Sequence, residues 1–305
     1  MQRKPKTILF YSFKGGVGRT QLMLNVGKFL SEQKNKKVVL VDFDLYAPGL
    51  SYWLNNEVMD KKTKNEEFFF KYIIDFFSKN SDKEAEKNIF IKKMNSNLFL
   101  IPVYDMSNII IYHKLLIDWT EYLYSLKQHV NEPLFDGYYT TGDVILEHIV
   151  NKITEQINTP IDYILFDART GLTEISDLLF SNFIKLKIFI SAYNKQNIEG
   201  TNSVLRLLSE NNKEKHHILR ILSMKPKIND KEIEKLKTMA NLDQNISLKN
   251  KFVWHDIMEI DYIKELAIED FDMWEKNEKT FENYKKQISN IANKIENIFE
   301  EYSLE

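Results

Sequence analysis

The sequence predicts an α/β fold, with a doubly wound, mostly parallel sheet flanked by helices, helical insertions and a C-terminal helix. Several short segments are apolar at every position, which is typical of parallel strands buried on both faces. Segments with apolar residues at helical spacing alternate with them. One apolar segment runs directly into a glycine-rich loop, and two others run into aspartates. In such folds, ligands bind beyond the carboxyl ends of the strands, so we expect these motifs to gather at one rim of the sheet.

The first predicted strand covers residues 8–13, and a helix follows at residues 20–30, where Leu22, Val26 and Phe29 recur at helical spacing. Further strands are predicted at residues 38–41, 98–103, 163–166, 186–191, 218–223 and 252–254, with helices at about 106–130 and 198–209. There is no internal repeat and no Pro/Gly-rich linker, so the simplest division is a single domain over residues 1–305.

Two regions are expected to lie outside the basic alternation of strands and helices. The first is a helical insertion at about residues 52–97, whose centre is rich in aromatic and branched side chains from Phe68 to Phe77. An aromatic density of this kind predicts core packing, and an exposed part would mark a surface for a protein partner. The second is a helical extension at about residues 261–305.

The extension carries a one-sided apolar seam with alternating steps of three and four residues. Its members are Phe281, Tyr284, Ile288, Ile291, Ile295, Ile298 and Tyr302. Such a seam fits packing on the domain's own core, a coiled-coil contact with a partner, or attachment to a membrane surface. The polar face mixes Glu296, Glu300 and Glu301 with lysines, which argues against the membrane.

Composition restricts the partners. Lys and Arg number 42 against 44 Asp and Glu, a formal net charge of −2, so no global basic field attracts nucleic acid. Cysteine is absent, which removes disulfides and thiolate chemistry and fits a reducing compartment. No run of 18 apolar residues predicts a membrane span. These features predict a cytoplasmic protein without nucleic acid as a partner.

The loop after the first strand reads Lys14-Gly-Gly-Val-Gly-Arg-Thr20 and contains three of the nine glycines in the chain. Phosphate binding needs exposed backbone N–H groups at a helix N-terminus, a cation, and a hydroxyl for Mg²⁺. The glycines, Arg19 and Thr20 supply these groups. The predicted cofactor-binding residues are Gly15, Gly16, Val17, Gly18, Arg19, Thr20 and Gln21.

This loop resembles the deviant Walker A motif, K-G-G-x-G-K-[ST], of the ParA/MinD family of the SIMIBI class, in a K-G-G-V-G-R variant. It departs from the general P-loop pattern at Phe13, where a glycine is usual, and at Arg19, where a lysine is usual. The resemblance implies ATP and Mg²⁺ as cofactors and an ATP-sandwiched homodimer. It implies that Lys14 reaches the partner's nucleotide as a catalytic residue and that Arg19 holds the phosphates in its own subunit.

Asp42 and Asp44 follow the second strand and resemble the family's switch I segment, whose second carboxylate positions the attacking water. Side chains repeat every two residues along a strand, so both carboxylates are expected to face the same site. The resemblance implies that Asp44 is catalytic and that Asp42 contacts the metal. The alternative is an aspartate that caps a helix or closes a turn.

Residues 162–167 resemble a Walker B strand, which implies that Asp167 contacts Mg²⁺ together with Thr20. Oxygen ligands are what magnesium prefers. Arg169 follows closely, where it would stabilise charge on the transferred phosphate as a built-in arginine finger. The alternative is an ion pair between Arg169 and Glu174 or another neighbouring carboxylate.

Recognition of the base rests on the resemblance alone. The family often offers an asparagine after the strand at 218–222, where this chain reads Ser223-Met-Lys-Pro226. No N-K-x-D motif of guanine-binding proteins is present. The polar segment at residues 194–200 either lines the site or forms a loop and helix N-cap.

The leading hypothesis is therefore a Mg²⁺-dependent ATPase that hydrolyses slowly and switches between monomer and homodimer. It would regulate a partner bound through residues 52–97 or the C-terminal helix, and a role in bacterial defence follows from the same resemblance. Two alternatives remain: a scaffold or sensor that holds ATP almost without turnover, and a metabolic ligase or kinase on the same fold.

Overall fold

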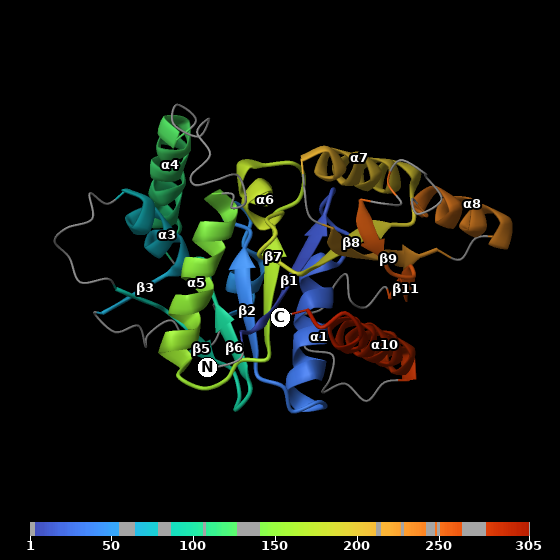
Figure 1. Cartoon of the computed structure of the whole chain (residues 1–305), viewed down its shortest axis with the longest axis horizontal. Helices are drawn as coiled ribbons and strands as arrows, with labels where there is room; N and C mark the ends of the chain where they lie inside the picture. The colour runs from blue at the N-terminus through green and yellow to red at the C-terminus, as the bar shows by residue number, and fades with distance from the viewer. Residues whose placement is uncertain are drawn as a thin grey trace.

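A nine-stranded sheet forms the centre of the described protein, in the strand order β10-β9-β8-β1-β7-β2-β6-β5, with β11 also paired to β9 (Figure 1). The computed structural model describes residues 4–54, 65–78, 87–105, 108–126, 141–211, 215–226, 229–241, 248, 251–263 and 279–304. The described strand pairs in this sheet are parallel except β5 with β6. The predicted doubly wound, mostly parallel fold is confirmed.

The predicted strands occur where the apolar runs placed them. Four short strands were not predicted: three in the insertion, and β11 after β10. The bounds of the strands are β1 Lys6–Ser12, β2 Val38–Phe43, β3 Glu66–Glu67, β4 Asn88–Ile89, β5 Lys92–Lys93, β6 Leu98–Ile101, β7 Tyr163–Ala168, β8 Leu186–Ala192, β9 His216–Lys225, β10 Phe252–Trp254 and β11 Met258–Asp261. The insertion is therefore not only helical, because β3 pairs with β4 in a separate small sheet and β5 extends the main one.

Helices connect these strands and cover both faces of the sheet. Their bounds are α1 Arg19–Glu32, α2 Gly49–Leu54, α3 Phe69–Ser78, α4 Ile109–Leu126, α5 Thr141–Ile157, α6 Glu174–Leu179, α7 Lys195–Asn211, α8 Asp230–Ala240 and α10 Lys279–Glu301. The predicted helix at 106–130 corresponds to α4, and residues 106–107 and 127–130 lie outside the described residues.

The two faces of the sheet separate because successive side chains along a strand point in opposite directions. On β1, Ile8 and Phe10 pack with α1 and α10, whereas Leu9 and Tyr11 join the core beneath α3, α4, α5 and α7. Apolar side chains at every strand position are thus buried on one face or the other. This burial fixes the carboxyl ends of β1, β2 and β7 side by side.

The aromatic segment of the insertion is part of the core, as its density predicted. Phe68, Phe69, Phe70 and Tyr72 are at most 5% exposed, and their rings contact those of neighbouring elements, among them the pair Phe43–Phe69. The side chains of Phe76 and Phe77 lie outside the described residues.

The C-terminal helix α10 packs on the protein's own core, beside α1 (Figure 1). Ile288, Ile291 and Ile295 are fully buried against it, while Tyr302 is exposed. Glu296 forms ion pairs with Lys34 and Lys36 beyond the end of α1. Of the three alternatives for the apolar seam, the structure shows packing on the domain's own core. This packing places α10 at the wall of the site described below.

We expect Ile291→Ala to lower the free energy of unfolding by about 2–5 kcal/mol, because it opens a cavity between α10 and α1. Urea denaturation followed by circular dichroism measures the change. Asn297→Ala, on the exposed side of the same helix, should shift stability by no more than about 0.5 kcal/mol. Equal effects of the two substitutions would contradict the packing of α10.

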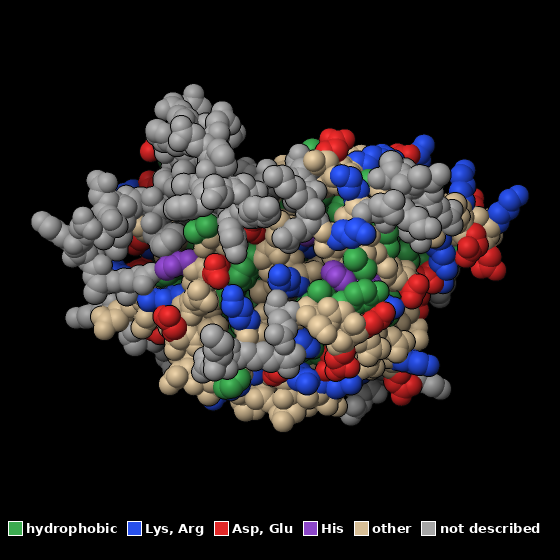
Figure 2. All heavy atoms as spheres, in the orientation of Figure 1, with side chains coloured by type: hydrophobic (Ala, Val, Ile, Leu, Met, Phe, Trp, Pro, Cys, Tyr) green, Lys and Arg blue, Asp and Glu red, His purple; other side chains and the backbone are tan. Residues whose placement is uncertain are grey.

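The face shown in Figure 2 carries basic and acidic side chains intermixed, as expected from the nearly balanced composition. Among the described helices, none combines the length and the apolar character needed to cross a membrane.

Candidate functional site

The glycine-rich loop leaves β1 and opens directly into α1, as its sequence predicted. Gly16 and Gly18 have φ angles of 74° and 76°, in the left-handed region that favours glycine. Gly18 is the N-cap of α1, with no side-chain cap and no acidic residue in the first turn. The backbone N–H groups at this helix end are therefore left for an external anion.

The loop is held in place from the sheet. Ser223 at the end of β9 donates its hydroxyl to the carbonyl oxygen of Val17 at 2.9 Å. Phe13 lies against Gly200 of α7, where a Cβ would stand 2.0 Å from the ring, so glycine is required for this approach. In the same segment, Asn194 accepts a hydrogen bond from the backbone of Asn197, as predicted for a helix N-cap.

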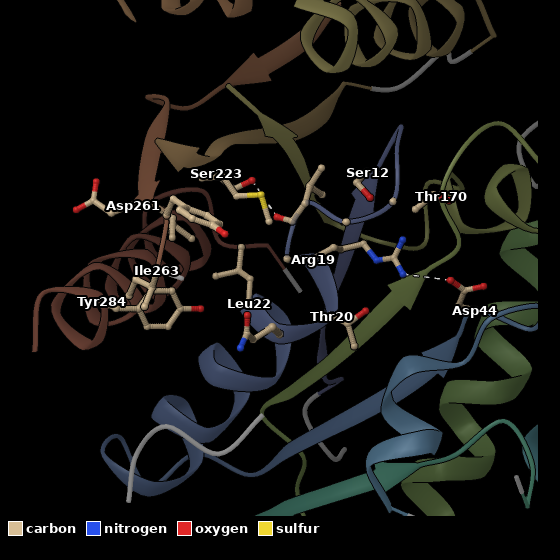
Figure 3. A pocket seen from close by; sticks show the side chains of 18 of the residues that line it. Ser12, Arg19, Thr20, Leu22, Asp44, Thr170, Ser223, Asp261, Ile263 and Tyr284 are labelled. Atoms are coloured by element: carbon tan, nitrogen blue, oxygen red, sulfur yellow. Dashed lines mark hydrogen bonds and ion pairs between the residues drawn. The ribbon is translucent and has the colours of Figure 1, made fainter. Parts of the chain in front are cut away.

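A cavity of about 560 Å³ lies in front of the loop (Figure 3). All the predicted loop residues from Gly15 to Gln21 line it, together with Asp44 and Thr170. Arg19, Thr20 and Asp44 lie toward one end, and Ile263 and Tyr284 toward the other (Figure 3). The cavity therefore joins a polar end at the phosphate loop to an apolar end formed by the C-terminal third.

The polar end is organised by Arg19, whose side chain is only 7% exposed. Its Nε donates to Asp167 Oδ1 at 2.6 Å and its Nη2 to Asp44 Oδ2 at 3.3 Å. Thr20 Oγ1 donates to the other oxygen of Asp167 at 2.6 Å. We call this set of contacts between Arg19, Thr20, Asp44 and Asp167 the Arg19 clasp.

Two buried polar atoms at this end have no hydrogen-bond partner among the described residues: Arg19 Nη1 and Ser12 Oγ. Both residues line the cavity. An unpaired buried donor is costly, so these atoms point to a polar ligand.

Asp42 and Asp44 do not take equivalent positions. Asp44 lines the cavity, and its Oδ1 accepts from the backbone of Ala47 at 3.1 Å. Asp42 is fully buried, and its Oδ2 accepts from both the backbone and the hydroxyl of Ser51 in α2. Its Oδ1 accepts from the backbone of Asp44. Asp42 thus fixes the backbone of Asp44 and the first turn of α2. Asp42 does not line the cavity, so its position fits the alternative of a structural, helix-capping aspartate better than the predicted metal contact.

Burial and mutual repulsion dominate the electrostatics of these carboxylates. Burial, followed by the charge of Asp167, raises the pKa of Asp42 to about 8, although the Ser51 hydrogen bonds oppose the shift. Burial also raises the pKa of Asp44 despite the opposing charge of Arg19. Burial acts to lower the pKa of Arg19, but Asp167 and Asp44 outweigh it and the net shift is upward. The positive charge of Arg19 therefore does not fully offset the burial and mutual repulsion of Asp42, Asp44 and Asp167.

The raised pKa of Asp42 predicts a pH-dependent stability. Between the ordinary aspartate pKa near 4 and the folded value of about 8, the folded chain binds more protons than the unfolded one, so stability falls as pH rises. We expect Asp42→Asn to flatten this fall, by up to about 1.4 kcal/mol per pH unit. Urea denaturation at several pH values from 5 to about 8 tests it. Parallel profiles for wild type and variant would show that Asp42 is ionised in the folded protein.

Arg169 and Lys14 lie off the cavity wall. The Arg169 guanidinium stacks 3.8 Å from the centre of the Tyr46 ring, which ties the end of β7 to the segment after β2. The suggested partner Glu174 has a side chain outside the described residues. Lys14 is half-buried at the start of the loop and is not among the residues facing its own cavity.

The apolar end of the cavity was missed from the sequence. Its lining residues come from the end of β9, from β11 and the two residues after it, and from α10: Met224, Ile260, Asp261, Tyr262, Ile263 and Tyr284. Asp261 is the one carboxylate in this set, and its Oδ2 accepts a hydrogen bond from Asn283. Met224 has a φ of 57°, in the left-handed region that is unusual for this residue type. Its position next to the predicted strand at 218–223 was the one available signal.

A magnesium ion fits the chemistry of the polar end but not a site made by protein alone. No group of three or more His, Cys, Asp or Glu side chains in the described ranges could by itself hold a metal ion. Mg²⁺ commonly takes only one or two carboxylates, with waters and substrate phosphates completing its shell. Asp167 and Thr20 offer such a partial set of oxygens.

The sequence profile of the AAA_31 family, described as an AAA domain, matches residues 5–221. The chain belongs to the AAA_31 family. The match covers the sheet from β1 through most of β9 and includes the glycine-rich loop, Asp44 and Asp167. The ParA/MinD-like P-loop character expected of the sequence is thereby confirmed.

Known relatives agree with this membership. The virulence plasmid ParA family protein pGP5-D of Chlamydia psittaci is 46% identical over 61 residues, which is 20% of this chain and 23% of the relative. The chain thus matches less than a quarter of that relative's length. A putative plasmid partition protein, BB_S35 of Borrelia burgdorferi, solved with AMPPNP, shares the fold of this AAA_31 protein at a TM-score of 0.56 and 18% identity. That likeness covers 96% of this chain and 99% of the other.

The apo form of McdA from Cyanothece gives a TM-score of 0.62 at 18% identity, over 94% of this chain and 98% of its own. At such identities the structural likeness shows the fold. It extends beyond the family match into the C-terminal third of this AAA_31 protein.

Proposed function

We propose that this chain binds Mg²⁺-ATP in the cavity at the glycine-rich loop, hydrolyses it slowly, and uses the bound nucleotide to control dimerisation. The observation that carries the proposal is the uncapped N-terminus of α1 beside the Arg19 guanidinium, whose Nη1 is buried and has no acceptor in the part of the chain that the structure describes. A phosphate group would satisfy both features. The fold shared with BB_S35, which was solved with AMPPNP, supports a nucleotide as the ligand.

The shape of the cavity suggests how a nucleotide would lie in it. Its phosphates would meet the loop, and its base would reach the apolar end near Ile263 and Tyr284 (Figure 3). The volume of about 560 Å³ is within the range of small-molecule sites, roughly 300–1,000 Å³. Adenine is assigned from the family resemblance.

The residues of the Arg19 clasp take separate roles in this proposal. Arg19 binds the phosphates, Thr20 and Asp167 hold Mg²⁺, and Asp44 orients the attacking water. The metal would neutralise phosphate charge and hold the phosphates in place. Asp42 supports Asp44 from below through its backbone. Arg169 has no assigned step, because its guanidinium stacks on Tyr46 away from the cavity wall.

Slow turnover follows from the Arg19 clasp. Asp44 and Asp167 both pair with Arg19. The cation proposed for the phosphates is therefore bound to the two carboxylates proposed for the water and the metal. Nucleotide binding must exchange these contacts. The same observation favours the second candidate function, a scaffold that holds ATP with hardly any hydrolysis. Phosphate release on a scale of minutes to hours marks the switch, and its absence marks the scaffold.

Dimerisation tests the switch directly. We expect wild type to become a dimer with a non-hydrolysed ATP analogue but not with ADP, as measured by light scattering after gel filtration. Lys14→Ala should bind ATP as a monomer, fail to dimerise and hydrolyse poorly, because Lys14 lies off the wall of its own cavity and is proposed to serve the partner's nucleotide.

Lys4→Ala is a matched control, since this exposed lysine pairs with Glu147 away from the loop. It should dimerise as wild type does. A wild type that stays monomeric at tens of micromolar with the analogue, or a Lys14→Ala that dimerises equally well, would remove the sandwich dimer and leave the scaffold.

A further inference from the structure

A second cavity, of about 410 Å³, lies at the edge of the sheet between α8 and the segment that joins β10 to β11. It is separate from the nucleotide cavity, although β9 contributes to both. Ser223 and Met224 of β9 line the first cavity, and Arg220, three residues earlier, lines the second. The family motifs leave this second cavity without a role.

Arg220 is the unusual group in this cavity, because it is only 1% exposed. One nitrogen, Nη1, donates to Asn202 Oδ1 and to the carbonyl oxygen of Ala240. The other two, Nε and Nη2, are buried and have no acceptor among the described residues. These two nitrogens form one edge of the planar guanidinium, with parallel N–H groups that match a carboxylate or phosphate.

A further unpaired donor belongs to the same cavity wall. The indole nitrogen of Trp254, on β10, is buried without a hydrogen-bond partner among the described residues. Indole nitrogen is a donor only, so it too requires an acceptor from outside. Three buried donor nitrogens of two residues that line one cavity therefore lack an acceptor within the described ranges.

The charge balance agrees with the hydrogen-bond count. Burial lowers the pKa of Arg220 to about 9, which leaves the guanidinium charged at neutral pH. No carboxylate in the described ranges contacts it. The acidic groups on the cavity wall pair with lysines and not with Arg220. Glu234 and Glu259 pair with Lys237 of the same wall, Glu259 also pairs with Lys225, and Asp256 pairs with Lys294. Glu259 Oε1 lies 3.1 Å from Lys237 Nζ as an ion pair but without hydrogen-bond geometry. A buried cation that no described carboxylate neutralises is costly and calls for an anion.

We infer that this cavity is a binding site for a small anion, whose carboxylate or phosphate group accepts a bidentate pair of hydrogen bonds from Arg220 Nε and Nη2. The Trp254 indole supplies a further donor. The volume suits a small organic acid or phosphate, and the site is independent of the nucleotide at the glycine-rich loop.

Nuclear magnetic resonance of the indole N–H groups tests this inference at the site itself. The chain has four tryptophans, and Trp254→Phe assigns the Trp254 signal by its loss. Malonate and inorganic phosphate are titrated separately into the full chain at constant ionic strength. We expect at least one of them to shift the Trp254 resonance saturably, while the resonance of Trp119, which α4 buries in the core, stays in place.

Two variants give the expected losses. Arg220→Lys keeps the charge but removes the fork, and should weaken binding about tenfold or more. Trp254→Phe keeps an aromatic ring but removes the indole N–H, and should weaken binding by roughly threefold to tenfold as measured by calorimetry. This variant provides the test if Arg220→Lys does not fold. Arg19→Lys should leave this binding unchanged.

The two probes distinguish the chemistry: a response to malonate alone assigns a carboxylate, and a response to phosphate alone assigns a phosphate. A Trp254 resonance that neither probe moves at tens of millimolar overturns the inference. Equal binding by wild type and both cavity variants overturns it as well.

Discussion

Replacing Arg19 by alanine should reduce the affinity for ATP by more than about 100-fold, because charge-assisted contacts to the phosphates disappear from a site that must neutralise several negative charges. The structure adds a second consequence. Arg19 pairs with the fully buried Asp167, so its removal leaves a buried carboxylate with Thr20 as the side-chain donor that remains among the described residues. We expect the free energy of unfolding to fall by about 3–5 kcal/mol.

Calorimetry with ATP and urea denaturation measure the two effects separately. Arg19→Lys is the informative control, since it restores a charge at the position where the family usually has lysine. It should bind ATP and recover part of the stability, while losing the planar fork that spans Asp44 and Asp167. If Arg19→Ala is folded and binds ATP within threefold of wild type, the assignment of the phosphate loop is wrong.

Asp44→Ala should lower the rate of ATP hydrolysis by roughly 10²–10⁴-fold while leaving ATP binding largely intact. A carboxylate that positions water acts in the transition state more than in the ground state. Its removal also takes away one of the two competitors for Arg19, so binding has no reason to weaken. Single-turnover phosphate release and calorimetry provide the two readings.

Asp44→Asn separates the charge from the shape of the turn, because the amide oxygen can still accept from the backbone of Ala47. It should hydrolyse as poorly as Asp44→Ala but keep wild-type stability more closely. Equal losses of binding and hydrolysis in both variants would make Asp44 a direct metal ligand or a structural residue.

Local sequence was sufficient to place the polar end of the site. A strand that is buried on both faces needs apolar side chains at every position, which is why β1 can be predicted from residue types. A loop with positive φ angles favours glycine, which is why Gly16 and Gly18 can be predicted in the same way. The aspartates at the carboxyl ends of β2 and β7 can be recognised in the sequence as well, since parallel strands bring these ends to one rim. Helices α5 and α8 were not predicted, although Ile145, Ile149 and Ile153 of α5 recur at helical spacing.

Tertiary contacts determine the different positions of the Asp42 and Asp44 side chains. A spacing of two predicts a common direction only while the strand continues, and β2 ends at Phe43. Asp42 then turns to Ser51, nine residues later, and Asp44 to Arg19 across the loop. Neither partner can be inferred from the segment itself.

Sequence by itself therefore determined the fold class, the glycine-rich loop and the acidic residues at the rim, because each depends on the residue types of one short segment. Only the tertiary structure decided the rest. It brought Tyr284 and Ile263 from the C-terminal third to the phosphate loop and closed the Arg19 clasp. It also left two nitrogens of Arg220, which lines the second cavity, without an acceptor among the described residues. These features join residues more than a hundred positions apart or depend on what is missing around a side chain, and both are set by packing.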